Sequence, residues 1–196
     1  MTQVRDALRE TVRQELVELA EIKDRELAEK VLDAWAYSLA ESGYGAISEI
    51  PGEGLPGVTI MKSGTQVDHV RGVTRLAIRL ADEMTACTAG FHCNRDVVVA
   101  GGLLHDVGKP FEFSPANRAK WTANPRASGL PAARHTLHGY HVCLTCGLPV
   151  EIAHIAGAHS PEGELVVRSL ECTVVHYADE SYWKLMRAGG LLSDQS

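Results

Sequence analysis

The sequence lacks the features of a secreted, disulfide-stabilised or membrane-spanning protein. Its five cysteines are odd in number and scattered along 196 residues, which fits reduced thiols better than a disulfide framework. No apolar run approaches the length that spans a bilayer, and the first residues have neither the basic start nor the apolar stretch of a secretory signal. We therefore expect a cytoplasmic protein that has no membrane partner.

Positive charge is also scarce. Lysine and arginine total 19 against 25 acidic residues, giving a formal net charge of -6. This balance argues against broad electrostatic binding to a nucleic acid polymer or an anionic membrane. Any anionic ligand must then be met by a local group of cations. The expected partner is a small-molecule substrate, and a homo-oligomer of the chain is left open.

The sequence contains no internal repeat, no low-complexity tract and no strong sign of a sheet. With 45% hydrophobic and 22% charged residues, the composition is that of a globular domain that can bury a substantial core. Apolar residues at helical spacing predict two helices between residues 4 and 43, stopped by Gly43. Thr65 and Asp68 predict the start of a third helix, with His69 in its first turn.

Later helices are expected at about 94–106, 136–146, 149–158 and 166–186, with Gly108 taking a left-handed conformation after the first of them. Residues 43–64, rich in glycine and proline, predict an irregular loop with a short hairpin around 58–60, and residues 110–133 predict a second long loop. We expect both loops to cover a pocket.

These elements predict one domain overall. Its parts are N-terminal helices at 1–44 packing on the core, the loop at 45–64, the core at 65–187 and a flexible tail at 188–196.

The pair His105-Asp106 is the most informative motif, because it closes the apolar run 97–104. An imidazole and a carboxylate at the inner end of a buried helix need compensation for lost water, and a cation compensates both. Asp179 similarly interrupts the core-like run 174–178. Imidazole nitrogen and carboxylate oxygen together suit a divalent ion that keeps open positions for water.

These residues resemble the HD superfamily of metal-dependent hydrolases, whose signature is a histidine, a His-Asp pair and a distant aspartate. The resemblance covers about residues 65–185, and the matching positions are His69, His105, Asp106 and Asp179. It implies an all-α, single-domain HD-type helical bundle, with the two long loops near the metal site. The cofactor it implies is one or two divalent ions, chosen from Fe, Mn, Co, Ni, Zn or Mg.

The family pattern also implies further site residues. Many members hold a second ion with two more histidines, and His135 and His159 match these positions, with His138 as the rival of His135. Asp106 and Lys109 are the expected catalytic residues, and the counterpart of Lys109 often faces the phosphate. Beyond the family pattern, the cations of the loop after Lys109 and two histidines are further expected substrate contacts, although His176 fits a plain surface position equally well. They are Arg118, Lys120, Arg126, Arg134, His138 and His176.

Two structural alternatives stay open. Cys143 and Cys146, with His138 and His141 nearby, have the look of a zinc knuckle, but no second ligand pair follows at the required spacing, and buried thiols are favoured. The aromatic residues at helical spacing either line a pocket or belong to the core. These aromatic residues are Trp121, Tyr140, Tyr182 and Trp183.

The leading functional interpretation is a hydrolase that activates water on one or two divalent ions against a phosphoester of a small metabolite or nucleotide. The second is a di-iron oxygenase of the inositol-oxygenase type, which cleaves a C–C or C–P bond with the same ligand set. A third is an HD hydrolase acting on a non-phosphorus substrate, and a fourth is a ligand sensor without activity.

Overall fold

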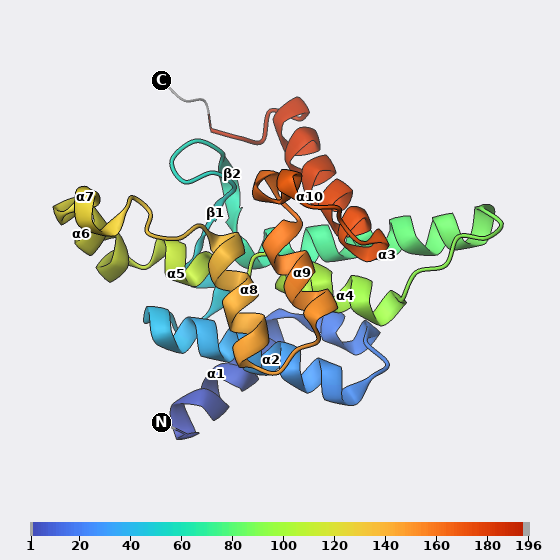
Figure 1. The fold of residues 1–196 in the computed structure, drawn as a ribbon, viewed down its shortest axis with the longest axis horizontal. Helices are drawn as coiled ribbons and strands as arrows, with labels where there is room; N and C mark the ends of the chain where they lie inside the picture. The colour runs from blue at the N-terminus through green and yellow to red at the C-terminus, as the bar shows by residue number, and fades with distance from the viewer. Residues whose placement is uncertain (1, 194–196) are drawn as a thin grey trace.

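The computed structural model describes residues 2–193, and helices form most of it (Figure 1). The chain begins with α1 (Thr2–Glu15), η1 (Val17–Glu21) and α2 (Arg25–Ser42), followed by η2 (Ile47–Glu49) and the strands β1 (Pro51–Glu53) and β2 (Ile60–Thr65). The later elements are α3 (Gln66–Cys87), α4 (Arg95–Leu104), α5 (Lys109–Phe113), α6 (Pro115–Ala123), α7 (Pro125–Ser128), α8 (His135–Thr145), α9 (Val150–Ala158), η3 (Pro161–Leu165) and α10 (Leu170–Ala188). The prediction of a helical fold is confirmed, with one small sheet added.

The buried helix α4 lies at the centre, and α2, α3, α9 and α10 pack around it. Two glycines let the neighbours approach closely. A Cβ at Gly101 would lie 2.4 Å from Cδ1 of Ile155 in α9, and one at Gly102 would lie 3.1 Å from Cα of Thr74 in α3. These contacts leave no room for a larger side chain. They bring α3 and α9 close to α4, which carries the His-Asp pair at its end.

The N-terminal helices support the same region from the other side. Asp24 caps α2 by accepting hydrogen bonds from two backbone N–H groups, and Gly43 ends α2 with φ of 79°. On the buried face of α2, Trp35 Nε1 donates to Leu103 O at 2.8 Å and Ser38 Oγ donates to Val107 O at 2.6 Å. Both acceptors flank the His-Asp pair, so α2 fixes the backbone on which the pair lies.

The two strands form an antiparallel hairpin with Pro51 opposite Thr65, near the position where the sequence predicts one. The expected flexible tail binds to this hairpin as far as the structure describes it. Lys62 N donates to Leu191 O at 2.9 Å, and Ser193 N donates to Ile60 O at 2.8 Å. Residues 194–196 lie outside the described residues.

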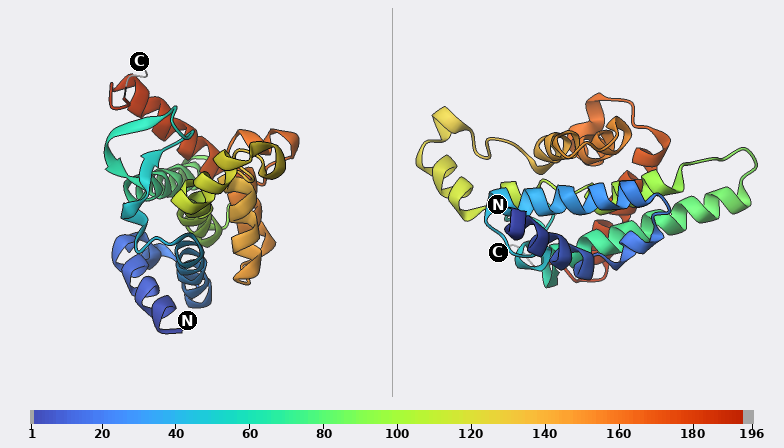
Figure 2. Two further views of the ribbon diagram at one scale, coloured as in Figure 1. Left: turned by 90° about the vertical axis from the view of Figure 1, so that its left-hand side faces the viewer. Right: turned by 90° about the horizontal axis from the view of Figure 1, so that it is seen from below.

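The prediction of a long loop at 110–133 is wrong, because α5, α6 and α7 occupy most of it. Pro115 and Pro125 favour a loop by composition, but each lies at the first position of a helix, where the missing N–H costs nothing. Figure 2 shows α6 and α7 projecting from one end of the molecule. None of the described helices is long and apolar enough to cross a membrane.

Two helix ends also differ from expectation. The last helix begins at Leu170 rather than at 166, because the Ser169 side chain caps it by accepting from Cys172 N. Gly108 is not left-handed, since its φ is -84°. Close packing, rather than backbone conformation, explains why a glycine occupies this position. A Cβ there would lie 2.0 Å from the backbone oxygen of His135.

Candidate metal centre

Four of the predicted ligands meet in the interior from three helices. His69 lies in the first turn of α3, whose start is fixed by Asp68 accepting from Thr65 N at 2.8 Å. His105 and Asp106 follow the last turn of α4, and Asp179 lies in the middle of α10. His69, His105 and Asp106 are almost fully buried. The folding of α3, α4 and α10 thus brings distant parts of the chain to one point.

The distances within this group are those of ligands around one cation. His69 Nε2 lies 3.1 Å from His105 Nε2 and 3.3 Å from both Asp106 Oδ2 and Asp179 Oδ1. One ring N–H cannot point at three partners. Two ligands bound to one ion at about 2.1 Å, with tetrahedral or octahedral angles, lie about 3.0–3.4 Å apart. The spacing therefore fits a shared divalent ion.

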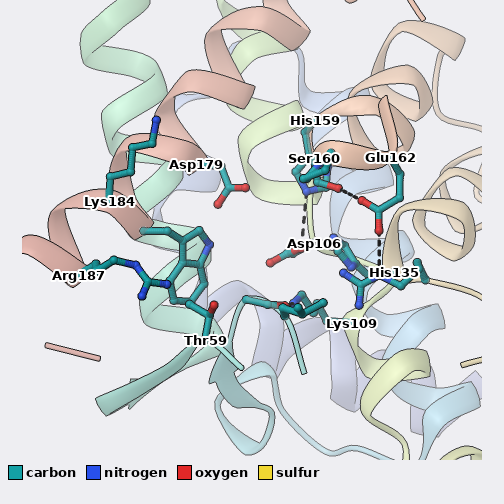
Figure 3. Close-up of a pocket in the computed structure, with 15 residues that line it drawn as sticks. Thr59, Asp106, Lys109, His135, His159, Ser160, Glu162, Asp179, Lys184 and Arg187 are labelled. Atoms are coloured by element: carbon teal, nitrogen blue, oxygen red, sulfur yellow. Dashed lines mark hydrogen bonds and ion pairs between the residues drawn. The ribbon is translucent and has the colours of Figure 1, made fainter. Parts of the chain in front are cut away.

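A second group lies on the other side of Asp106. His135 Nε2, at the start of α8, lies 3.2 Å from Asp106 Oδ1, and His159 Nε2, at the end of α9, lies 3.8 Å from the same oxygen. The other carboxylate oxygen, Oδ2, faces His69 and His105. Figure 3 shows Asp106 between Asp179 and His135. One carboxylate therefore stands between two groups of potential ligands.

Hydrogen bonds leave the converging Nε2 atoms available. His105 Nδ1 donates to Gly102 O at 2.7 Å, and His159 Nδ1 donates to carbonyl oxygens of α9 at 3.1 and 3.2 Å. His135 Nδ1 donates to Glu112 Oε2 at 3.0 Å. With the proton held on Nδ1, the lone pair on Nε2 is free to bind a metal.

The electrostatics favour neutral imidazoles at His105 and His159 and ionised carboxylates at Asp106 and Asp179, the forms that bind metals. Burial opposes protonation of His69 as well, but its contacts with Asp106 and Asp179 raise its pKa. Burial lowers the pKa of His105, and burial lowers the pKa of His159 to about 3. Burial opposes ionisation of Asp106, but the Lys109 charge and the neighbouring imidazoles hold its pKa well below the usual range. Burial likewise opposes ionisation of Asp179, but its close contact with the His69 imidazole holds its pKa at about 2.

Unpartnered polar atoms complete the test of fit. Within residues 2–193, the buried atoms Asp179 Oδ1 and His69 Nδ1 have no hydrogen-bond partner, although Asp179 Oδ1 is within ion-pair distance of His69. A buried carboxylate oxygen without a directed donor is costly. A cation at the meeting point of these side chains would compensate it, so the residues fit a metal.

Comparison with known proteins agrees with this geometry. The family profile named HD domain matches residues 67–182 of the chain, well over half of its length. The chain belongs to the HD domain family. It is also similar to the dihydroneopterin 2',3'-cyclic phosphate phosphodiesterase of Methanocaldococcus jannaschii, at 27% identity over an alignment of 186 residues that covers 87% of this chain and 68% of the relative. No solved structure matches the chain.

Two polar residues of this HD domain support the centre and were missed in the sequence. Gln66 Nε2 donates to Asp106 Oδ2 at 2.7 Å, and Glu112 accepts from His135 Nδ1. Gln66 precedes His69 by three residues, so helical spacing places both on one face of α3. Glu112 falls in the stretch interpreted as a loop. Glu112 is only 3% exposed. Nothing in the sequence indicates this burial unless the helix α5 is recognised.

Lys109 holds the hairpin in this HD domain. Its ammonium donates to Glu53 O at 2.7 Å and to Gly54 O at 2.6 Å, and the side chain is only 1% exposed. It also borders the cavity beside the centre. Two of the three ammonium protons are thus committed to the turn between β1 and β2, which makes Lys109 a tether for the cavity wall.

A cavity of about 490 Å³ opens beside the centre (Figure 3). The hairpin contributes Gly54, Leu55 and Thr59 to its lining, as expected of a covering loop, but residues 110–133 contribute none, so the expected second covering loop is not there. Trp183 also lines the cavity, whereas Trp121, Tyr140 and Tyr182 do not. The remaining lining residues are Asp106, Lys109, Arg134, His135, His159, Ser160, Pro161, Glu162, Asp179, Lys184 and Arg187.

Of the predicted substrate contacts, only Lys109 and Arg134 line this cavity. Arg134 lines it, but its guanidinium pairs with Glu112 and, at 2.8 Å, with Glu162. His138 pairs with Glu41 and stacks on Phe111, so His135 rather than its rival lies at the centre. The residues that lie outside the cavity lining are Arg118, Lys120, Arg126, His138 and His176.

The structure also shows where His176 and the cysteines of α8 lie. His176 lies outside the cavity and donates from Nδ1 to His159 O, so it contacts the backbone of a candidate ligand. Cys143 is buried, and burial raises its pKa. Among the described residues, none of the groups able to hold a metal includes a cysteine, in keeping with the preference for buried thiols over a zinc knuckle.

Proposed function

We propose that the chain is a metal-dependent phosphohydrolase that cleaves a phosphoester of a small metabolite or nucleotide. The observation that carries the proposal is the position of Asp106, whose two oxygens face two separate groups of histidines. A carboxylate placed in this way can bridge two divalent ions, and a pair of ions suits hydrolysis at phosphorus. The candidate ligands of the two ions are His69, His105, Asp106, His135, His159 and Asp179.

The substrate class we would test first is a 2',3'-cyclic phosphodiester. The relative from Methanocaldococcus jannaschii bears the name of a phosphodiesterase for such a substrate. A cavity of about 490 Å³ also lies in the usual range for small-molecule sites, and the negative net charge of the chain disfavours a nucleic acid polymer. A small cyclic phosphodiester satisfies all of these observations.

The residues of the chain divide the work of holding this site. A divalent ion, when bound, supplies Lewis acidity and lowers the pKa of the water it binds from 15.7 to about 7. Gln66 holds one oxygen of Asp106, while Glu112 keeps the His135 proton on Nδ1. Lys109 fixes the hairpin wall. These buried hydrogen bonds set the ligand atoms before any ion arrives, which reduces the cost of binding it.

The test combines elemental analysis with a substrate screen. The purified protein is analysed for metals, then assayed with 2',3'-cyclic nucleotides and phosphomonoesters, with and without oxygen. We expect divalent-metal-dependent phosphoester hydrolysis that needs no oxygen. Two iron atoms per chain with oxygen consumption and no phosphoester turnover would instead indicate an oxygenase, and turnover of carbon esters or amides alone would indicate a non-phosphorus hydrolase.

A matched pair of variants on α8 links the activity to the centre. His135 faces Asp106, whereas His141 lies six residues later on the exposed side of the same helix. We expect His135→Ala to reduce kcat at least about 100-fold, because it removes a ligand of the proposed site, and His141→Ala to leave it within about twofold. Equal activity of the two variants would count against the proposed site.

A further inference from the structure

One face of α10 leads away from the metal centre along the cavity. Asp179, Trp183 and Arg187 are spaced four residues apart, so they lie in a row on this helix, and all three line the cavity. The rise of 1.5 Å per residue separates neighbours in the row by about 6 Å, and the two ends by about 12 Å. The row therefore begins with a candidate metal ligand and ends with a guanidinium.

Among the residues that the structure describes, Arg187 carries the one cation of the cavity lining that has no hydrogen-bond or ion-pair partner. Lys109 is bound to two carbonyl oxygens, Arg134 to two carboxylates, and Lys184 to Glu180 at 2.9 Å. Within residues 2–193, the Arg187 side chain makes neither a hydrogen bond nor an ion pair. Figure 3 shows it extending from α10 toward the cavity near Thr59. It is thus free to bind an anion.

The indole of Trp183 forms a fixed wall between the two ends of the row. Its ring stacks on the His69 ring, with centroids 4.6 Å apart and planes at 29°. On the hairpin side it is so close to Gly54 that a Cβ there would lie 3.2 Å from it. Because it is packed on both sides, the Trp183 ring is held in position. It places an apolar surface between the metal centre and Arg187.

We propose that the cavity recognises a second anionic group of its substrate at Arg187, apart from the phosphoester that reacts. This group is an oxyanion, either a phosphate or a carboxylate, and the part of the substrate that joins it to the reacting phosphoester passes over Trp183. The inference rests on the proposed function for the place of the reacting group. It adds the substrate class, which is a small molecule with two anionic ends.

Paired ligands test the subsite by equilibrium binding. Adenosine 3'-phosphate and adenosine 3',5'-bisphosphate differ by one phosphate, and the affinity of the Mn²⁺-loaded protein for each is measured by calorimetry, with phosphate release followed separately. We expect the bisphosphate to bind at least about 10-fold more tightly, the usual gain for a charge-assisted hydrogen bond. Arg187→Gln should abolish this gain while changing the affinity for adenosine 3'-phosphate less than about twofold.

Two variants control the measurement. Arg126→Gln removes an exposed arginine outside the cavity lining and should keep the full gain. Arg187→Lys keeps the charge but loses the planar pair of donors, so it should keep part of the gain. A gain that persists in Arg187→Gln, or equal affinities of the native protein for both ligands, would overturn the subsite.

Binding and turnover separate the two proposals. If the gain is present and depends on Arg187 while no phosphoester is hydrolysed, the subsite stands and the proposed function fails. If 2',3'-cyclic phosphates are hydrolysed while the additional phosphate brings no affinity, the proposed function stands and the subsite fails.

Discussion

The buried carboxylate of Glu112 gives His135 a different hydrogen-bond acceptor from those of the other histidines of the centre. His105 and His159 donate to backbone carbonyls, whereas His135 donates to Glu112. A carboxylate acceptor raises the electron density of the imidazole more than a carbonyl does, and so makes Nε2 a better ligand. Burial opposes the ionisation of Glu112, but the hydrogen bond with His135 keeps its pKa below the usual value. The charge is therefore present where it is needed.

We expect Glu112→Gln to weaken the binding of divalent ions to the apoprotein about 10- to 100-fold, because the amide accepts from His135 without supplying charge. A competition titration with a coloured chelator and Co²⁺ measures this affinity. Glu151→Gln, an exposed position on α9, is the matched control and should not change it. Unaltered Co²⁺ affinity in Glu112→Gln would refute the supporting role.

Gly108 is a second residue whose identity is set by its surroundings. We expect Gly108→Ala to lower the free energy of unfolding by about 3 kcal/mol, since the new Cβ would meet the backbone of His135 rather than a flexible side chain. At this chain length the loss corresponds to a fall in Tm of about 6–12 °C. Gly45→Ala, where the Cβ would meet only side-chain atoms of Glu49 at 3.1 Å or more, should change Tm little. Thermal unfolding compares the two.

At the scale of elements, the hairpin is held from two directions. The Lys109 ammonium binds the turn after β1, and backbone hydrogen bonds join β2 to residues 191–193. A two-stranded hairpin alone is barely stable in water. Its order in this protein therefore depends on these tethers, which connect it to the core motif and to α10.

We expect Lys109→Met to speed amide hydrogen exchange in residues 53–59, because the apolar stem stays packed while both hydrogen bonds are lost. Exchange in α9 should stay unchanged, which makes that helix the internal reference. Mass spectrometry of the peptides after exchange measures both. An unchanged hairpin would show that β2 and the tail suffice to hold it.

The sequence predicted the elements that have a strong period or a clear cap. The apolar run before His105, the cap formed by Asp68 and the stop at Gly43 all led to helices found in place. Prolines misled the prediction at α6 and α7, because a proline that breaks a helix and one that begins it look alike without the fold. Arg187 and Trp183 were not singled out as a pair, since only the packing of α10 on the hairpin places them at a cavity.

At the scale of the whole molecule, the core encloses two carboxylates whose removal from water is costly without a cation. Asp106, at the end of the central helix α4, is buried, and Asp179 in the neighbouring helix α10 is largely buried at the same centre. Burial opposes the ionisation of both carboxylates. Packing of the helices must offset this cost whenever the centre has no ion.

We therefore expect divalent ions to stabilise the entire fold. At 100 times its dissociation constant, a bound ion adds about 2.7 kcal/mol, which raises Tm by about 5–10 °C for a chain of this length. Scanning calorimetry with Mn²⁺ and with excess EDTA measures the difference. A Tm that is equal in EDTA and in each of Mg²⁺, Mn²⁺, Co²⁺, Ni²⁺, Zn²⁺ and Fe²⁺ would contradict the metal centre.

The attachment of residues 191–193 to β2 has a practical consequence for protein engineering. A purification tag or fusion partner joined close behind Ser193, whose amide donates to Ile60, would pull on β2, the strand that follows the turn lining the cavity. The amino end offers a safer attachment point, because α1 lies across the molecule from the end of α10 (Figure 1). Affinity handles and fluorophores placed before α1 would leave the cavity undisturbed.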